Sequence, residues 1–307
     1  MKYQGCVAGT GAELAVEKEG LRLGSRFLDY ADVAKLCPLN HRVLVDTLAG
    51  ESIEISMLGF SYDGFWEELT RCYGERSLEA LFVAEEQLML CEGEYELPGE
   101  TGRAAVALYP DSVCILPATC RALRVPLCYT KEIALTGYRI QITMVSGASY
   151  AVGKMGYDTK PFFERLSKAA DATKKERAEL LAAAPLTPPF THKGLFRTKQ
   201  TEQCWNAAFA ENACALEFFA DEDAATYLYR FSEPRELFLE KLREATEAMG
   251  VRREVICLPQ EQLEQNPLYR MAAARSEAVR FLRARLDGRL IHNASHAQRL
   301  AEYLKQQ

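Results

Sequence analysis

Residues 42–69 read RVLVDTLAGESIEISMLGFSYDGFWEEL, and residues 139–166 read RIQITMVSGASYAVGKMGYDTKPFFERL. Placed at an offset of 97 without gaps, the two stretches are identical at seven of twenty-eight positions, where chance would give about two. The identical pairs are Arg42/Arg139, Gly50/Gly147, Ser52/Ser149, Gly59/Gly156, Phe65/Phe162, Glu67/Glu164 and Leu69/Leu166. The chain therefore contains an internal repeat, and the fold depends on what one copy forms.

Each copy changes its hydrophobic period partway along. Apolar residues first alternate, as at Val43 and Val45, which is typical of a half-buried strand. A short connection containing glycine leads to a second alternating run, and apolar residues then recur every three or four positions, as at Phe65, Leu69 and Cys72. Both copies are therefore predicted to form a β-hairpin followed by an amphipathic helix.

A divergent third copy is predicted after the Pro-rich stretch that ends at Phe190. Two apolar runs bracket the acidic sequence DEDAA at 221–225, and Phe238 and Leu242 in the following helical pattern repeat the spacing of Phe65 and Leu69. The expected organisation is a first module at 1–90, a second at 91–185, a linker at 186–199, a third hairpin and helix module at 200–260 and a C-terminal helical segment at 261–307.

Repeated units of about ninety residues, with short strands first and one closing helix, resemble the pleckstrin-homology-like (PH-like) superfold, particularly its tandem bacterial forms. The resemblance implies an α+β protein of tandem small antiparallel barrel or sandwich modules, each closed by a C-terminal helix. In the eukaryotic family a Trp of that helix packs against the barrel. Trp66 stands at this position, with Phe163 in the second copy, so we expect Trp66 to be buried.

The resemblance does not extend to phosphoinositide binding. Family members that bind these lipids carry several Lys and Arg between their first two strands. We place the corresponding loops at 17–20 (EKEG) and 109–112 (YPDS), and neither is basic. A phosphoinositide membrane is therefore not an expected partner.

Composition is that of a globular protein. The 307 residues are 48% hydrophobic and 26% charged, with a net charge of −6, which argues against disorder and against a protein that coats nucleic acid. No apolar run approaches the roughly 20 residues of a membrane span. Ten cysteines without a CxxC motif favour a reducing compartment, so the expected location is cytoplasmic.

Motifs for catalysis or cofactor binding are weak. The sequence from Gly9 to Leu14 begins like a dinucleotide fingerprint but lacks its third glycine, so a turn is favoured. Cys114, Cys120 and Cys128 do not have zinc-ribbon spacing and are interpreted as structural thiols. We expect no catalytic residue and no cofactor.

Two of the four histidines, His292 and His296, are four residues apart. If the segment between them were helical, both imidazoles would share one face, and Glu302 could approach as a third ligand. Because two ligands alone make a weak site, the sequence favours a solvated or capping pair and no metal site.

The C-terminal segment is basic, with a net charge of +4 from residue 262 onward. A basic surface is expected from six of its arginines, Arg270, Arg275, Arg280, Arg283, Arg285 and Arg289. The favoured interpretation is that they pair with the acidic body of the chain or with a second copy, with Arg280, Arg283 and Arg285 as candidate partner-binding residues. Contact with nucleic-acid phosphates is the alternative.

The sequence thus favours a non-enzymatic binding or scaffolding protein that uses repeated modules for protein–protein interaction, as a monomer or a homo-oligomer. The two copies share few polar residues, so the repeat preserves the fold of a module and not a set of polar site residues. Two alternatives stay open: a nucleic-acid-associated protein that uses the Arg-rich segment, and an enzyme whose site lies between modules.

Overall fold

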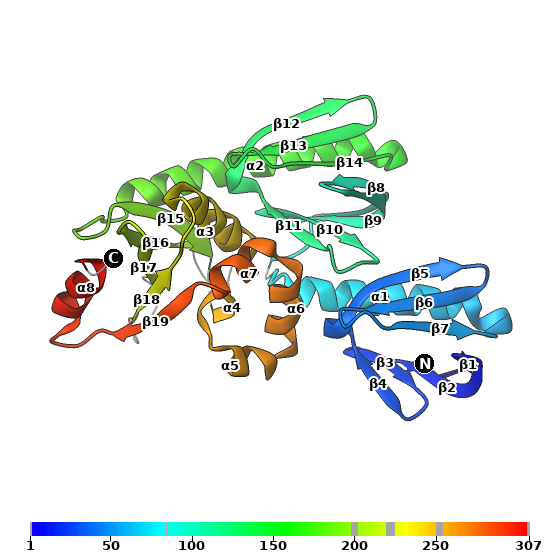
Figure 1. Cartoon of the computed structure of the whole chain (residues 1–307). Helices are drawn as coiled ribbons and strands as arrows, with labels where there is room; N and C mark the ends of the chain where they lie inside the picture. Colours follow the sequence, from blue (N-terminus) through cyan, green and yellow to red (C-terminus); the bar gives the residue numbers. More distant parts are fainter. Residues whose placement is uncertain (1, 84, 198–201, 219–224, 250–253, 306–307) are drawn as a thin grey trace.

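The protein is a mixed α+β structure, as the sequence predicts, with three antiparallel sheets among the described residues (Figure 1). The computed structural model describes residues 2–83, 85–197, 202–218, 225–249 and 254–305. Within them no helix is long and apolar enough to cross a membrane.

The first sheet has seven strands in the order β4-β3-β2-β1-β7-β6-β5. Its elements are β1 (Lys2–Val7), β2 (Thr10–Val16), β3 (Gly20–Leu23), β4 (Arg26–Asp29), β5 (Val33–Leu39), β6 (Arg42–Thr47) and β7 (Ser52–Ser56), followed by the 3-10 turn η2 (Gly59–Ser61) and helix α1 (Tyr62–Ala80). The loops from β1 to β2 and from β2 to β3 are both short. Because β2 ends at Val16 and β3 begins at Gly20, residues 17–19 lie between the second and third strands, not between the first two as the sequence suggested.

The second sheet repeats this order as β11-β10-β9-β8-β14-β13-β12. Its elements are β8 (Met89–Leu97), β9 (Glu100–Leu108), β10 (Ser112–Pro117), β11 (Leu123–Pro126), β12 (Thr130–Thr136), β13 (Arg139–Met144) and β14 (Ser149–Gly153), followed by η4 (Gly156–Asp158) and α2 (Thr159–Ala183). Each unit is therefore seven strands and then one long helix.

The repeat extends to strand register. Val43 pairs with Ile55 in the first hairpin, and Ile140 pairs with Val152 in the second, which are equivalent positions at the offset of 97. Ladder irregularities also fall at equivalent places, after Val33 in β5 and after Thr130 in β12. The predicted hairpin and helix are confirmed in both copies.

Backbone geometry explains one conserved pair of the repeat. Gly50 has a φ of +84° and Gly147 a φ of +91°, in the turns that close the two hairpins. A side chain is strained in this left-handed region, so glycine is favoured at both positions.

One core lies between the two halves of the first sheet. It joins Leu14 and Leu21 from the early strands to Val45 and Ile55 from the late strands, all of them buried. Phe65 of α1 is 0% exposed and packs edge-to-face on Tyr3. The helix therefore closes the module with an aromatic residue, as expected.

The expectation for Trp66 was wrong. Trp66 is only partly buried and packs at the edge of the core that Phe65 enters. Neighbouring helical positions differ by about 100° around the axis, so only one of the two aromatics can point fully inward. The second module has the same arrangement, with Phe162 buried and Phe163 partly buried.

The third sheet has five strands in the order β15-β16-β17-β18-β19. Its strands are β15 (His192–Arg197), β16 (Glu202–Phe209), β17 (Ala213–Phe218), β18 (Ala225–Arg230) and β19 (Leu286–Ile291). Helix α3 (Arg235–Met249) follows β18, which confirms the hairpin and helix of the third copy. Most of the acidic sequence at 221–225 lies outside the described residues.

Two expected boundaries need correction. Residues 192–197 of the expected linker form β15, and residues 286–291 of the expected helical segment form β19. Each of these strands gains its hydrogen bonds from a neighbour in the third sheet. The described helices that follow α3 are α4 (Glu254–Cys257), α5 (Gln260–Glu264), α6 (Pro267–Arg275), α7 (Glu277–Arg283) and α8 (His296–Lys305).

Both faces of the third sheet are covered. Leu216 and Tyr229 point to one face, where Phe238 of α3 and Leu282 of α7 pack against them. The opposite face carries a second core that is covered by Leu300 of α8. The C-terminal segment thus supplies strand β19 and the covering helix α8 to a sheet that begins about 90 residues earlier.

Backbone and side-chain contacts join the modules. Lys35 of β5 forms a bridge with Thr119 of the second module, and the Tyr129 hydroxyl donates to the Leu195 carbonyl at 2.8 Å. Met271 of α6 is 1% exposed and enters the core of the first module. The C-terminal segment therefore contacts the first and third cores together.

Candidate binding surface and a histidine cluster

A fully exposed aromatic residue precedes helix α1. Phe60 lies in η2 and is 110% exposed, while Leu58, two residues earlier, is 5% exposed. Gly59 between them has a φ of +56°, which turns the chain sharply. The turn is therefore anchored by Leu58 and presents Phe60 to solvent.

The second module repeats this turn. Met155 is 6% exposed, Gly156 has a φ of +60° and Tyr157 is 102% exposed. The two sequences, LGF at 58–60 and MGY at 155–157, are equivalent at the offset of 97. We call the pair Phe60 and Tyr157, with the glycines before them, the aromatic turns.

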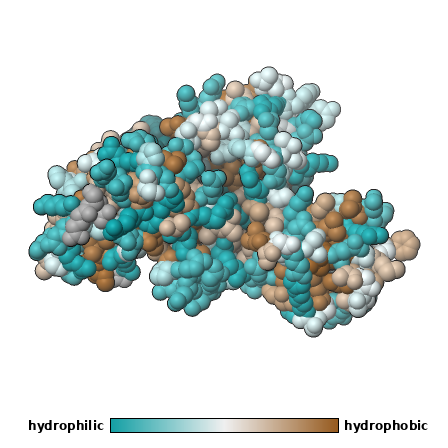
Figure 2. Space-filling view, viewed as in Figure 1, coloured by the Kyte–Doolittle hydropathy of each residue, from teal (hydrophilic) through white to brown (hydrophobic). Residues whose placement is uncertain are grey.

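Both aromatic turns lie at the same side of the molecule. Helices α1 and α2 begin at the right in Figure 1 and run toward the third sheet, so the turns that precede them are both at the right. Figure 2 shows hydrophobic residues gathered on the first module at the lower right. Large exposed apolar side chains of that module are Phe27, Leu39, Leu48, Met57 and Phe60.

The alignment of the two copies contains a signal for the aromatic turns, but the sequence alone did not identify Phe60 and Tyr157 as exposed. The repeat preserves Gly59/Gly156 and replaces one aromatic by another at the next position. Aromatic residues are usually interpreted as core, and only the solvent exposure of these two distinguishes them.

The three arginines predicted as partner-binding residues all have acceptors within the chain. Arg285 forms an ion pair with Glu233 and lies over the Phe281 ring. Arg283 donates to the Val255 carbonyl at 2.8 Å. Arg280 is exposed and donates to the Ala274 carbonyl. Partner binding by these residues stays a prediction, and Arg280 is the most accessible of the three.

Two further arginines attach the C-terminal segment to the first module. Arg270 is 3.2 Å from the Asp32 carboxylate, and Arg275 donates to the Ser77 hydroxyl at 3.0 Å. The ion pair with Asp32 supports the interpretation that the basic segment pairs with the acidic body of its own chain.

A cavity of about 560 Å³ lies between the second module, α3 and the helices α6 and α7. Its basic lining includes Arg121, Arg124, Lys241, Arg275 and Arg280, and its acidic lining is Glu244 and Glu277. Burial is the main cause that lowers the pKa of Arg275. An active site between modules, the enzyme alternative, would occupy a place of this kind.

The other sequence candidates lie in a turn and at buried or half-buried positions. Gly9 belongs to the turn between β1 and β2, which confirms the turn interpretation. Cys114 and Cys128 are buried and Cys120 is half-buried, and none of these three cysteines is in a disulfide bond. Burial raises the pKa of Cys114 to about 12, so its thiol stays protonated at neutral pH.

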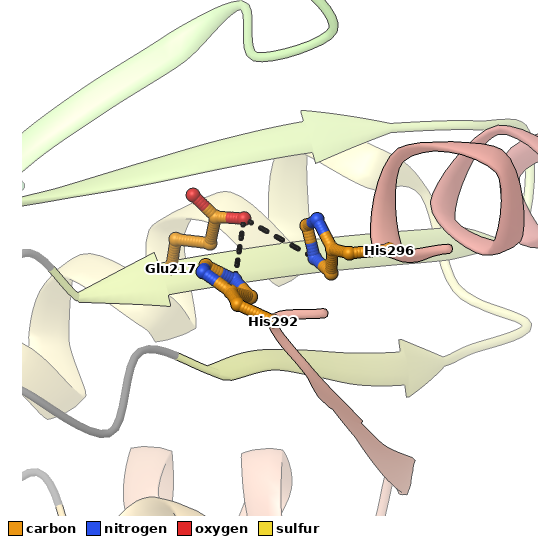
Figure 3. A group of neighbouring side chains, drawn as sticks. All are labelled: Glu217, His292 and His296. Carbon is orange, nitrogen blue, oxygen red and sulfur yellow. Dashed lines mark ion pairs between the residues drawn. The ribbon is translucent and has the colours of Figure 1, made fainter. Parts of the chain in front are cut away.

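Glu217, His292 and His296 converge on the face of the third sheet that α8 covers (Figure 3). Glu217 lies on β17, His292 directly follows β19 and His296 begins α8. In the sheet Glu217 pairs with Thr226, and Thr226 pairs with Leu290, two residues before His292. Since side chains alternate along a strand, these residues share one face.

Three atoms of the cluster lie close together. Glu217 Oε1 is 3.3 Å from His292 Nε2 and 3.7 Å from His296 Nε2. The side chains of Glu217 and His296 are 11% and 16% exposed, and that of His292 is 33% exposed. Burial, and next the neighbouring His292, lower the pKa of His296, so its imidazole is neutral at pH 7.

The third ligand that the sequence offered for a helical segment was Glu302. The segment between the histidines is a turn, not a helix, in which Ser295 N–H donates to Asn293 Oδ1 at 3.0 Å. Glu302 instead accepts a hydrogen bond from Gln298 at 3.0 Å. Glu217, which lies 75 positions before His292, is the third residue of the cluster in place of Glu302.

Comparison with known proteins adds no family. No family model matches the chain, and no curated protein matches it. Among solved structures it is similar to the C-terminal domain of an unknown protein from Leishmania infantum, with 11% identity and a TM-score of 0.26, over 35% of this chain and 96% of that one.

Proposed function

We propose that this chain is a non-enzymatic binding protein that holds a protein partner on its two aromatic turns. The observation that carries the proposal is the repetition of one exposed aromatic, Phe60 or Tyr157, on a turn anchored by a buried residue. Aromatic side chains are enriched at protein interfaces because they bury a large area at a small cost in conformational entropy.

The PH-like interpretation of the modules belongs to the same proposal. Seven strands followed by one helix, in the same strand order twice, support it. Contacts between the modules support a scaffolding role, because the bridge at Lys35 and the buried Met271 fix the modules relative to one another. Two turns at fixed separation can engage one partner at two points, which raises the apparent affinity.

The nucleic-acid alternative has less support. Nucleic-acid binding would need Arg283 and Arg285, whose guanidinium groups already have acceptors within the chain. Salt-sensitive binding of DNA or RNA would favour that alternative.

The double variant Phe60→Ser with Tyr157→Ser tests the proposal. Partners of the wild-type chain are identified by cross-linking and mass spectrometry, and their affinities are then measured with purified proteins. We expect affinity to fall at least about 30-fold, because a central interface aromatic contributes about 2 kcal/mol or more. Folding should not change, since both side chains are exposed.

Val145→Ser is the matched control, because Val145 is 64% exposed and lies at the opposite end of β13 from the aromatic turn. It should keep the affinity of the wild type. If the double variant binds every partner as tightly as the wild type does, the proposal is wrong.

Vesicles that contain phosphoinositides should not retain the protein at physiological salt. The connections between the first two strands, at 8–9 and 98–99, contain no Lys or Arg. Lys18 in the next loop is 2.9 Å from Glu79, which offsets its charge. Cosedimentation with such vesicles that disappears in Lys18→Ala would contradict this prediction.

A further inference from the structure

We propose that Glu217, His292 and His296 bind one divalent first-row transition-metal ion, with Zn²⁺ as the reference case. The candidate ligand atoms all lie within 4.8 Å of one another. An ion with tetrahedral bonds of about 2.0–2.2 Å holds its ligands roughly 3.3 Å apart. The separation of 3.3 Å between Glu217 Oε1 and His292 Nε2 already has this value, and His296 Nε2 is 0.4 Å farther.

Three independent elements hold the ligands in place. Glu217 is fixed by the pairing of β17 with β18, and His292 follows β19, which pairs with β18 on its other side. Leu300 of α8 is 2% exposed in the core beneath the helix, which fixes the helix that begins at His296. A preformed arrangement of this kind lowers the cost of ordering ligands when the ion binds.

In the absence of an ion, the Thr226 hydroxyl connects the three residues of the cluster. Its hydroxyl donates to Glu217 Oε1 at 2.6 Å and lies 3.1 Å from His292 Nε2 and 2.7 Å from His296 Nε2. One hydroxyl can donate once and accept twice, so this network is complete when both Nε2 atoms carry protons. A metal ion requires the Nε2 lone pairs, so each ring must move its proton to Nδ1 when the ion binds.

The burial of the Glu217 carboxylate also favours a cation at this site. Glu217 is 8% exposed, and the two imidazoles lie within 3.7 Å of its Oε1 atom. A metal ion bound at Glu217 Oε1 would give this buried oxygen a cation as its partner. In the bound state the Thr226 hydroxyl would still donate to Glu217 and orient it as a ligand.

The ligand set defines the class of metal. Imidazole nitrogen suits Zn²⁺, Co²⁺, Ni²⁺, Cu²⁺ and Fe²⁺, whereas Mg²⁺ and Ca²⁺ prefer oxygen ligands. Three protein ligands leave a fourth position for water or for a group of a partner. The ion would connect β17 to β19 and α8, and so fasten the end of the C-terminal segment to the third sheet.

Titration of chelator-treated full-length protein with ZnCl₂, followed by calorimetry, tests this inference. We expect one site, with His296→Ala and Glu217→Gln at least about tenfold weaker. His41→Ala is the matched control, because His41 is an exposed histidine of another module and should leave Zn²⁺ binding unchanged. MgCl₂ should give no binding. Circular dichroism of each variant without metal establishes that it is folded.

The same titration with CoCl₂ distinguishes this site from the ten cysteines. Nitrogen and oxygen ligands give visible bands without the near-ultraviolet charge-transfer band of thiolate. Thiolate charge transfer, equal affinity in wild type and Glu217→Gln, or absence of a binding site in the wild type would each overturn the inference. The last outcome would leave the Thr226 hydrogen-bond network as the role of the cluster.

Discussion

Deletion of residues 262–307 is expected to unfold the third sheet and to weaken the first module. The deletion removes strand β19 and six buried residues from the third core, which are Leu263, Ala272, Ala273, Ala278, Val279 and Leu282. It also removes Met271 from the first core. Each large side chain contributes about 1.5–3 kcal/mol by burial, so the total approaches the 5–15 kcal/mol that stabilises a whole domain.

Hydrogen exchange followed by mass spectrometry measures this effect segment by segment. We expect loss of protection in β15 to β18, partial loss in α1 and retained protection in the strands of the second module. Arg280→Ala is the control within the segment, and it should change stability by less than about 0.5 kcal/mol because Arg280 is exposed. A truncated chain with the protection and melting temperature of the full chain would refute the prediction.

Docking of the segment should also persist in 0.5 M NaCl. The pair of Arg270 with Asp32 is partly exposed, at 28% and 49%. Such a pair contributes about 0–1 kcal/mol and is screened by salt, whereas apolar burial is not. Dissociation of the segment in salt would mean that charge, not burial, holds it.

Phe65→Ala should destabilise the first module by about 3–5 kcal/mol, and Trp66→Ala by clearly less. Phe65 is 0% exposed and its ring centroid is 5.1 Å from that of Tyr3, so its removal leaves a cavity at the closed end of the module. Trp66 is only partly buried. Urea unfolding, with hydrogen exchange in β1 and β7 as the local measure, compares the two variants.

The repeat provides the matched experiment. Phe162 is equivalent to Phe65 and is also 0% exposed, so Phe162→Ala should have the same effect on the second module and little on the first. If Trp66→Ala proves as damaging as Phe65→Ala, the assignment of Phe65 as the closing residue is wrong.

Local patterns were sufficient for the hairpin and the closing helix of each of the first two modules. The periods of two and of 3.6 residues depend on neighbours within one element, and they predicted the hairpins β6–β7 and β13–β14 and the helices α1 and α2. They did not distinguish the buried Phe65 from the partly buried Trp66, because both are aromatic residues at neighbouring positions of the apolar face of the helix.

The sequence by itself determined the repeat, its register and its turns, since these follow from hydrophobic period and from backbone conformations that favour glycine, as at Gly50 and Gly147. Only the tertiary structure decided that 286–291 is a strand, because its partner β18 lies more than 50 residues earlier in the chain. It likewise decided that Glu217 joins His292 and His296. Strand pairing and ligand convergence are contacts between distant segments, and no local period of the sequence records which segments will meet.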